Sequence, residues 1–277
     1  MTTLDQYAVI GHPIAHSKSP DIHQMFAEQT GEQLEYSKID VDEPDFENFV
    51  REFFALPEDK GLNVTVPFKE RAWALAEVKS ERAALAGAVN TLWLKDGQLY
   101  GDNTDGVGLV HDLKWNHSVG IRNVKILIIG AGGAVRGVLQ PILNENPHSI
   151  TIANRTVSKA QTLIELFGHL GQLKASSFED VDQRFDLIIN GSSASLQGSV
   201  PEIDPVVIGP NTVVYDMMYG REMTVFNRWA HEHGARQTLD GLGMLVEQAA
   251  EAFRLWRGVL PDTASVIAHL RAKFLNS

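Results

Sequence analysis

The sequence predicts an α/β protein of two domains: an N-terminal α/β domain with a mixed sheet, and a second domain with a doubly wound parallel sheet. Three observations support this fold class. An apolar run, Lys125–Ile129, ends at a glycine-rich turn and is followed by a helix-compatible segment. From Val124 to about Asp240, strand-like and helix-like segments alternate, as in a parallel sheet covered on both faces. The chain has 277 residues, 44% of them hydrophobic, which is enough for two cores of ordinary size.

The glycine turn Gly130-Ala131-Gly132-Gly133 predicts the phosphate-binding corner of a Rossmann-type domain. Glycines let the backbone approach a pyrophosphate, and the N–H groups and dipole of the next helix, from about Ala134, favour its negative charge. The turn departs from the G-x-G-x-x-G pattern, because Val135 stands where the third glycine would be. An ordinary turn between a strand and a helix is the alternative interpretation.

The end of the next strand indicates which dinucleotide is bound. The strand Ser149–Ala153 leads into Asn154-Arg155-Thr156, with no carboxylate to hold the ribose 2′-hydroxyl of NAD. A guanidinium suits a 2′-phosphate, because its fork pairs with phosphate oxygens that a carboxylate would repel. We therefore predict NADP(H) as the cofactor. The alternative is that Arg155 is a solvated surface residue.

The composition excludes several classes of function. The net charge is −11, from 24 basic and 35 acidic residues, which argues against nucleic acid or an anionic membrane as the main partner. There is no cysteine, so a thiol nucleophile is not possible, and the ten histidines form no metal-binding pattern, so no metal is assigned. The sequence has neither a signal-peptide pattern nor an apolar run long enough to span a bilayer. We expect a cytoplasmic protein.

The N-terminal domain is expected to contain a mixed sheet. The pair Asp96-Gly97 predicts a two-residue hairpin, after which the chain returns antiparallel. Ser80 is expected to cap a short helix, Glu81–Ala86. The expected strands are Tyr7–Gly11, Leu34–Ile39, Gly61–Val66, Ala88–Leu94 and Gln98–Tyr100.

Two residues of this domain are placed as ligand-binding side chains would be. Thr65 and Lys69 lie near the carboxyl end of a predicted parallel strand, the edge at which open α/β sheets bind ligands. A lysine at a helix start faces the positive end of the helix dipole. Lys69 is therefore either free in solvent or held there for a reason.

Other polar residues at helix starts have simpler explanations. Asp105 opens a helix that runs to about Asn116, and it could be an ordinary acid of the first turn. Ser17 and Ser19 precede a helix that Pro20 can open, and capping would explain one of the two serines better than both.

The second domain is expected to contain five strands and to be followed by two helices. The first of these helices has an apolar stripe typical of core packing, and Gln248 lies off that stripe, as an exposed helical glutamine would. The two helices can reach back to the first domain. We therefore predict one domain of residues 1–104 plus 241–277 and a second of residues 105–240. The expected strands are Lys125–Ile129, Ser149–Ala153, Asp186–Asn190, Thr212–Met217 and Ala235–Leu239.

Eight motifs in order along the chain resemble those of the shikimate dehydrogenase family. The resemblance extends from about residue 7 to the C-terminus. The motifs are Ser17-Lys18-Ser19-Pro20, Asn63–Lys69 (NVTVPFK), Gly87–Leu92 (GAVNTL), Gly101–Gly106 (GDNTDG), Gly130–Ala134, Asn154-Arg155-Thr156, Tyr215–Tyr219 (YDMMY) and Gly241–Phe253 (GLGMLVEQAAEAF).

This resemblance implies an NADP-dependent enzyme that interconverts 3-dehydroshikimate and shikimate, on the route to chorismate and aromatic amino acids. It implies a substrate domain with a deep cleft facing the NADP domain. One departure is visible, because Asn190-Gly191-Ser192-Ser193 stands where the family usually has N-A-T-S. The implied substrate contacts are Ser17, Ser19, Thr65, Lys69, Asn90, Asp105, Tyr219 and Gln248. The implied cofactor contacts are Gly130, Ala131, Gly132, Gly133, Ala134, Asn154, Arg155, Thr156, Met217 and Gly241, with Glu81 as a weaker candidate.

Shikimate offers three hydroxyls and one carboxylate, which hydroxyl and amide side chains can satisfy. We expect Ser17 and Ser19, with Tyr219, to hold the carboxylate, and Lys69 and Asp105 to form the acid–base pair. The sequence leaves open which of the pair moves the proton, and whether the protein is a monomer or a homodimer.

Two alternatives to this function remain. A quinate/shikimate dehydrogenase with relaxed cofactor use would tend to carry an acidic residue near Arg155. A non-catalytic sensor of NADPH or shikimate would not need both Lys69 and Asp105.

Overall fold

The computed structural model describes residues 4–192 and 194–276 of the chain. It contains two compact units. One ends at Gly108 and includes Val246–Val266, and the other comprises Leu109–Leu245 and the residues from Ile267 onward. The division passes through both C-terminal helices, α9 (Leu242–Arg257) and α10 (Thr263–Asn276). The functional division into residues 1–104 plus 241–277 and residues 105–240 stays a prediction.

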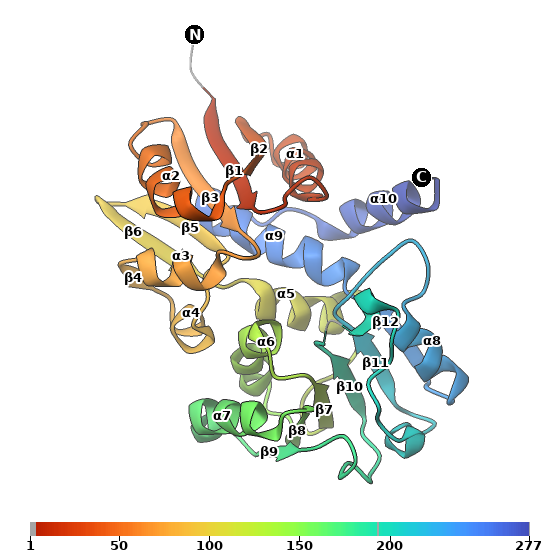
Figure 1. Ribbon diagram of the computed structural model, residues 1–277. Coiled ribbons are helices and arrows are strands. Elements are labelled where there is room, and N and C mark those ends of the chain that lie inside the picture. The colour runs from red at the N-terminus through yellow and green to blue at the C-terminus, as the bar shows by residue number, and fades with distance from the viewer. Residues whose placement is uncertain (1–3, 193, 277) are drawn as a thin grey trace. The chain divides into compact units, whose positions relative to one another are not determined.

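The strands of the first unit are β1 (Asp5–Gly11), β2 (Leu34–Asp40), β3 (Asp59–Val64), β4 (Val78–Lys79), β5 (Thr91–Lys95) and β6 (Gln98–Asp102). They form one mixed sheet in the order β2-β1-β3-β5-β6-β4 (Figure 1). β1 pairs parallel with β2 and β3, whereas β5 pairs antiparallel with β3 and with β6 across the Asp96-Gly97 hairpin. The predicted mixed sheet is therefore confirmed.

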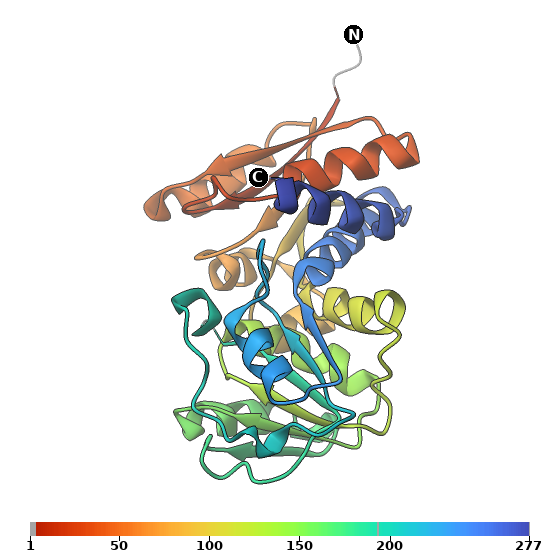
Figure 2. The same ribbon diagram turned by 90° about the vertical axis from the view of Figure 1, so that its right-hand side faces the viewer.

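The helices of the first unit cover the apolar side chains of this sheet. Figure 2 shows α1 running alongside β2, to which it is packed. Phe46 and Phe68 stack at 4.5 Å between ring centroids within a core that includes Ile10 and Leu92. Ser80 caps α4 as predicted, because its Oγ accepts a hydrogen bond from the Ala83 N–H. The helices are α1 (Ser19–Thr30), α2 (Phe46–Phe53), α3 (Lys69–Leu75) and α4 (Glu81–Ala86), with a 3-10 turn at Glu43–Asp45. The division between the two units passes through the next helix, α5 (Asp105–His111).

The strands of the second unit are β7 (Lys125–Ile129), β8 (Ser149–Ala153), β9 (Leu173–Ser176), β10 (Leu187–Asn190), β11 (Val213–Asp216) and β12 (Gln237–Asp240). All are parallel, in the order β12-β11-β10-β7-β8-β9. Counted along the chain this is the order 3-2-1-4-5-6 of a doubly wound dinucleotide fold, in which the connection reverses between β7 and β10. The predicted Rossmann-type domain is confirmed.

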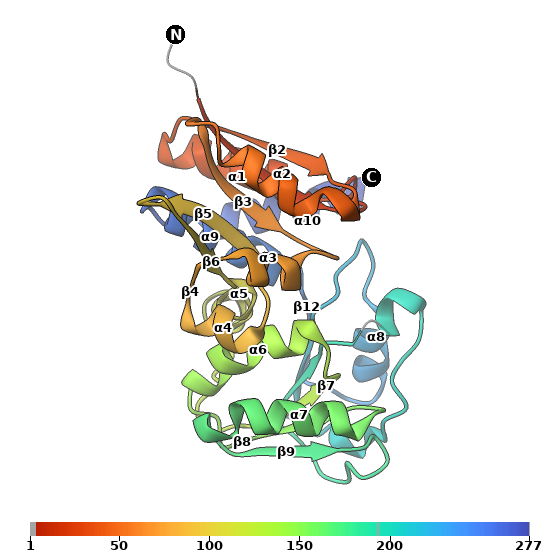
Figure 3. The same ribbon diagram turned by 60° about the vertical axis from the view of Figure 1, so that its left-hand side comes forward.

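Helices flank this parallel sheet. Figure 3 shows α7 alongside β8 and β9, and Figure 1 shows α8 near β11 and β12, in agreement with their packing. The core beneath includes Leu127, Ile188, Val214 and Phe226, all fully buried. The helices are α6 (Gly133–Asn144), α7 (Val157–Phe167) and α8 (Val225–Glu232), with 3-10 turns at Gly168–Leu170, Ala194–Gln197 and Pro205–Val207.

Several predicted boundaries were wrong in detail. β3 ends at Val64 rather than at residue 66, and β5 begins at Thr91 rather than at residue 88. The helix expected from Asp105 to Asn116 is α5 followed by a π-helical segment, Asp112–Asn116. The short strands β4 and β9 were not predicted, because they have two and four residues and carry no clear alternation.

Candidate active site

Lys69 and Asp105 form an ion pair in the first unit. Lys69 is the first residue of α3 and Asp105 the first residue of α5, and Lys69 Nζ donates to Asp105 Oδ2 at 2.6 Å. The lysine side chain is 29% exposed and the aspartate side chain 15% exposed. Lys69 is therefore not a free surface charge. Its unfavourable position at a helix start is offset by a carboxylate that lies far away in the sequence.

Asn90 fixes the other oxygen of Asp105. Its Nδ2 lies 2.9 Å from Asp105 Oδ1, 2.9 Å from Thr104 Oγ1 and 3.3 Å from Gln248 Oε1. Its Oδ1 accepts hydrogen bonds from the Thr104 N–H at 3.0 Å and from Thr91 Oγ1 at 2.8 Å. Asn90 and Thr104 are buried, so these contacts are shielded from water. Gln248 is part-buried and within this cluster, which corrects the simple expectation of an exposed helical glutamine.

Thr65 lies at the carboxyl edge of the parallel strands β1 to β3. Ser17 and Ser19 lie at the start of α1, the helix that follows β1. Thr65 comes directly after β3, and its N–H donates to Ile10 O at 3.0 Å. A side chain on Gly11 would lie 2.6 Å from Thr65 Cγ2, so glycine is needed at the end of β1 for this approach. Ser17 Oγ accepts the Ser19 N–H at 3.3 Å. The N-cap of α1 is Lys18 and the helix has no side-chain cap hydrogen bond, so the capping role that the sequence suggested for one of the two serines was wrong.

A buried chain of hydrogen bonds leads from Tyr36 to Asn90. The Tyr36 hydroxyl donates to Asn63 Oδ1 at 2.7 Å. Asn63 Nδ2 lies 3.2 Å from Thr91 Oγ1, which in turn donates to Asn90. Burial raises the pKa of Tyr36 well above its usual value, so the phenol remains a hydrogen-bond donor at neutral pH.

The sequence reasoning missed the residues that support this cluster, namely Tyr36, Asn63, Thr91 and Thr104. One signal was present for Asn63, an amide between the apolar residues Leu62 and Val64 in the buried second half of β3. A buried amide must find partners, so such an interruption predicts a polar network on that face. Nothing comparable distinguishes Tyr36, because a tyrosine on an alternating strand is commonplace.

Tyr219 and Glu81 are predicted site residues with few described contacts. Tyr219 belongs to the second unit, where it follows β11 and its ring lies 6.1 Å from that of Phe274. Burial raises the pKa of Tyr219, and Asp240 adds to that shift. Glu81 is exposed in the first turn of α4, in the first unit.

In the second unit, the glycine turn follows β7 as predicted. Gly130 has φ +106° and its N–H donates to Ala153 O at 2.8 Å, so a left-handed glycine joins the ends of β7 and β8. A Cβ on Gly130 would lie 3.2 Å from the backbone N of Ser192. At Gly132 and Gly133, where α6 begins, a Cβ would meet nothing within 4 Å. The helix N–H groups at this end are thus accessible over a bare backbone, which fits a pyrophosphate.

The missing third glycine has a structural explanation. Val135 is fully buried, and a Cβ on Gly191, after β10, would lie 2.5 Å from Val135 Cγ2 and 3.1 Å from Met217 Sδ. The close approach of helix and sheet is therefore achieved by a glycine on the sheet side instead of the helix side. The two departures from the expected motifs are therefore linked. Glycine at 191, in place of the alanine of N-A-T-S, leaves the space that Val135 fills in place of the third glycine of G-x-G-x-x-G. Ser193, the last residue of that motif, lies outside the described residues.

The segment Asn154-Arg155-Thr156 follows β8. Asn154 Nδ2 donates to Thr156 O at 2.8 Å, which fixes the turn before α7. Arg155 is exposed, and within residues 4–192 and 194–276 its guanidinium has no ion-pair partner. A 2′-phosphate would supply the oxygens that such a fork can pair with.

Met217 and Gly241 lie against one another. A Cβ on Gly241 would lie 2.1 Å from Met217 O, so only glycine fits between β12 and α9 at this point. Met217 N–H donates to Asn190 O at 2.9 Å, which ties the end of β11 to the end of β10. The turn residues Gly130 to Gly133 and these residues therefore all lie at the carboxyl edge of the parallel sheet.

A fully buried carboxylate, Asp216, organises the loop after β10. Its oxygens accept from Asn190 Nδ2 at 3.1 Å, from Ser195 Oγ at 2.7 Å and from the Met218 N–H at 3.1 Å. Burial raises the pKa of Asp216, and the hydrogen bonds, including one from Thr224, oppose that rise. Asp216 thus holds the loop beside the glycine turn in place.

The described parts of the chain contain neither a metal-binding cluster nor a helix that could span a membrane. No group of three or more His, Asp or Glu side chains there could hold a metal ion. No helix there has the length and apolar character to cross a bilayer.

Comparison with known proteins places three family models along the chain. The shikimate dehydrogenase substrate binding domain matches residues 9–92, the shikimate / quinate 5-dehydrogenase model matches residues 114–198, and the shikimate 5'-dehydrogenase C-terminal domain matches residues 241–271.

Individual proteins are similar over nearly the whole chain. A protein of Marinobacter nauticus named shikimate dehydrogenase (NADP(+)) is 57% identical over 273 residues, covering 97% of this chain and 99% of its own length. The crystal structure of an Ael1 enzyme from Pseudomonas putida is 46% identical with a TM-score of 0.93, covering 96% of this chain and 98% of its own. Shikimate 5-dehydrogenase from Thermus thermophilus, solved in complex with NADP(H) and shikimate, is 32% identical with a TM-score of 0.86, covering 98% and 99%.

Proposed function

Since the chain belongs to the shikimate dehydrogenase family, we propose that it uses Lys69 and Asp105 as an acid–base pair in the reversible, NADPH-dependent reduction of 3-dehydroshikimate to shikimate. This reaction lies on the route to chorismate and the aromatic amino acids. The observation that supports the roles of the two residues is their 2.6 Å contact, made between the first residues of two different helices.

We propose that Lys69 carries the proton and that Asp105 positions it. Asp105 accepts hydrogen bonds on both oxygens, from Lys69 at 2.6 Å and from Asn90 at 2.9 Å. An ammonium has three protons, so Lys69 can donate one to Asp105 and present another to the substrate oxygen. In reduction, the carbonyl oxygen takes this proton from Lys69; in oxidation, the neutral amine takes it back. The free lone pairs of Asp105 can accept the substrate hydroxyl and orient it.

The remaining substrate contacts are proposed from their chemistry. Ser17, Ser19 and Tyr219 would hold the carboxylate, and Thr65, Asn90 and Gln248 would satisfy hydroxyls. Each buried polar group left unpaired is unfavourable by about 1–3 kcal/mol, so a ligand lacking one hydroxyl would bind less well. The amides of Asn90 and Gln248 already face one another at 3.3 Å, which supports a common ligand for the two.

The cofactor supplies the hydride when bound, and the second unit holds it. We propose that the backbone from Gly130 to Ala134 binds the pyrophosphate at the start of α6. Asn154, Arg155 and Thr156 would bind the ribose 2′-phosphate, and Met217 and Gly241 would contact the rest of the nucleotide. Glu81 stays a weaker prediction. The bare backbone at Gly132 and Gly133 and the exposed Arg155 support this assignment.

The decisive experiment measures NADPH or NADH formation by absorbance when shikimate or quinate is added with NADP or NAD. We expect turnover with shikimate and NADP. Lys69→Ala should lower this turnover by about 10²–10⁴, whereas Lys95→Ala, a change at an exposed lysine on β5, should leave it unchanged. Comparable turnover with quinate and NAD would favour the relaxed enzyme instead. Binding of NADPH without any turnover would favour a sensor.

The state of assembly and the cellular location stay predictions. Light scattering on the purified chain distinguishes the monomer from the homodimer. The cytoplasm is the location expected from the sequence.

A further inference from the structure

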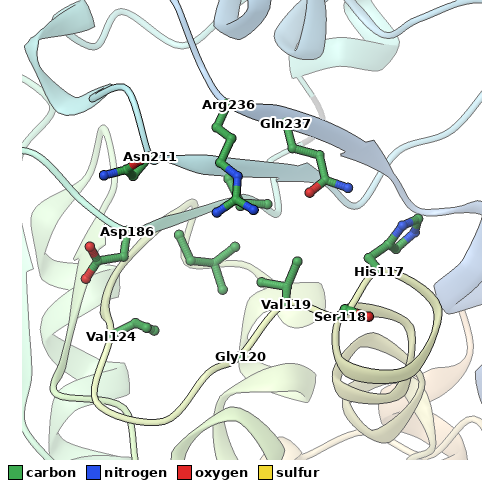
Figure 4. A pocket seen from close by; sticks show the side chains of 11 residues that line it. His117, Ser118, Val119, Gly120, Val124, Asp186, Asn211, Arg236 and Gln237 are labelled. Atoms are coloured by element: carbon green, nitrogen blue, oxygen red, sulfur yellow. The ribbon is translucent and has the colours of Figure 1, made fainter.

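The second unit contains a cavity of about 260 Å³ that none of the predicted site residues lines. It lies at the segment before β7 and at the starts of β10, β11 and β12 (Figure 4). Because these strands are parallel, their amino ends share one edge of the sheet, and the glycine turn lies at the other edge. The cavity is therefore separate from the proposed cofactor site.

The floor of this cavity is apolar. Leu187 and Val213 are buried sheet residues, and Val119 and Val124 in the preceding loop are half-buried. One wall is fixed, because His117 Nε2 lies 3.5 Å from Oδ1 of the fully buried Asp112. The cavity is thus built on the core of the unit.

Two side chains of opposite charge, Arg236 and Asp186, line this cavity, and both are exposed. Figure 4 shows the Arg236 guanidinium directed over the cavity, with the Gln237 amide beside it. Throughout the described parts of the chain, Arg236 has no ion-pair partner. The Asp186 carboxylate, on the far wall, already accepts the Lys125 N–H at 2.7 Å, and in Figure 4 it points away from the centre. The group that faces the cavity is therefore a cation without a counter-ion among the described residues.

We propose that this cavity binds a small monocarboxylic acid with an apolar body. The carboxylate pairs with Arg236 and receives a hydrogen bond from Gln237, and the body lies on Val119, Val124, Leu187 and Val213. The volume is slightly below the roughly 300 Å³ at which ligand pockets begin, so the body is no larger than a single ring with a short chain. An inorganic anion would leave the apolar floor uncovered. The net charge of −11 also disfavours a general attraction of anions, so binding here depends on the local arginine.

The test uses phenylacetate as the probe, titrated by calorimetry into the full chain. Phenylethanol keeps the ring without the charge, and inorganic phosphate keeps a charge without the ring. We expect phenylacetate to bind, and phenylethanol and phosphate to bind about tenfold more weakly or less. Arg236→Gln should weaken phenylacetate by about tenfold or more, whereas Lys174→Gln, which removes the same charge from an exposed position on β9, should not.

A second variant tests the floor. Val119→Asn should weaken phenylacetate while leaving the unfolding temperature close to that of the parent, because Val119 lies in a loop and is only half-buried. Turnover of shikimate with NADP should be unchanged in Arg236→Gln. The proposal is overturned if phenylacetate does not bind, if phosphate binds as tightly, or if Arg236→Gln and Lys174→Gln bind phenylacetate equally.

Discussion

Replacing Lys69 by alanine separates catalysis from stability. In the folded chain the change breaks the 2.6 Å contact with Asp105, whose side chain is 15% exposed and keeps the hydrogen bond from Asn90 at 2.9 Å. The lysine itself is 29% exposed. Ion pairs with this degree of solvent access contribute about 0.2–1 kcal/mol, so we expect the free energy of unfolding to fall by about 1 kcal/mol or less.

The expected effect on turnover is much larger. Positioned proton transfer contributes about 10²–10⁴ in rate, which corresponds to about 3–5 kcal/mol of transition-state stabilisation. Lys69→Ala should therefore lower kcat by about 10²–10⁴ while KM for shikimate changes little, because Asn90, Thr65 and Gln248 remain. The assay follows NADPH formation at saturating NADP, with urea unfolding of the same preparation as the measure of stability.

Lys69→Arg distinguishes proton transfer from simple charge. Arginine keeps the positive charge and can pair with Asp105, but it does not give up its proton near neutral pH. We expect it to be nearly as inactive as the alanine variant in shikimate oxidation. If Lys69→Arg kept most of kcat, or if Lys69→Ala lost activity only in proportion to lost folded protein, Lys69 would not be the proton carrier.

Three other changes test separate parts of the structure. Arg155→Ala should raise KM for NADP by about 10–100-fold and leave KM for NAD unchanged, and an unaltered NADP/NAD preference in steady-state kinetics would remove Arg155 from the 2′-phosphate site. Gly191→Ala should lower the free energy of unfolding in urea by about 1–3 kcal/mol, because its Cβ would lie 2.5 Å from Val135 Cγ2. Val135→Ala in the same chain should recover part of that loss. If the effects of the two changes simply add, the packing argument is contradicted. Burial lowers the pKa of His23 from 6.5 to about 3. As the pH falls, the unfolded chain therefore takes up a proton on this histidine before the folded chain does. The free energy of unfolding should fall by about 5 kcal/mol in all between about pH 6.5 and pH 3. His23→Phe should flatten that slope in denaturant titrations at several pH values, and an equal slope in both chains would exclude His23 as its cause.

The second unit was the more predictable of the two. The bounds of Lys125–Ile129 and Ser149–Ala153 are as the sequence suggested, since each is a short apolar run between clear turn signals. Parallel strands covered on both faces carry a continuous apolar pattern that is easily recognised. β9 was missed because Leu173–Ser176 at the sheet edge lacks that pattern.

The first unit shows what local patterns do not contain. The contact between Lys69 and Asp105 joins residues 36 positions apart, and each residue alone has an ordinary explanation as a surface charge or a first-turn acid. The resemblance to a family predicted that the two residues act as a pair, whereas spacing and composition did not. The supporting chain of Tyr36, Asn63 and Thr91 depends on which strands are neighbours, and sheet order is not written in any single strand.

The paired departures at residues 135 and 191 show that the glycine motif describes the space between two packed elements, and not only a set of residue identities. The third glycine of G-x-G-x-x-G serves close packing between helix and sheet, and that requirement concerns the sum of two facing side chains. Here the helix side carries Val135, fully buried, and the sheet side carries Gly191, so the space is shared differently. The first glycine has no such freedom, because Gly130 has φ +106° and lies close to Ser192. A sequence search that requires glycine at 130 but treats residues 135 and 191 as one constraint would accept this chain, whereas the simple pattern rejects it.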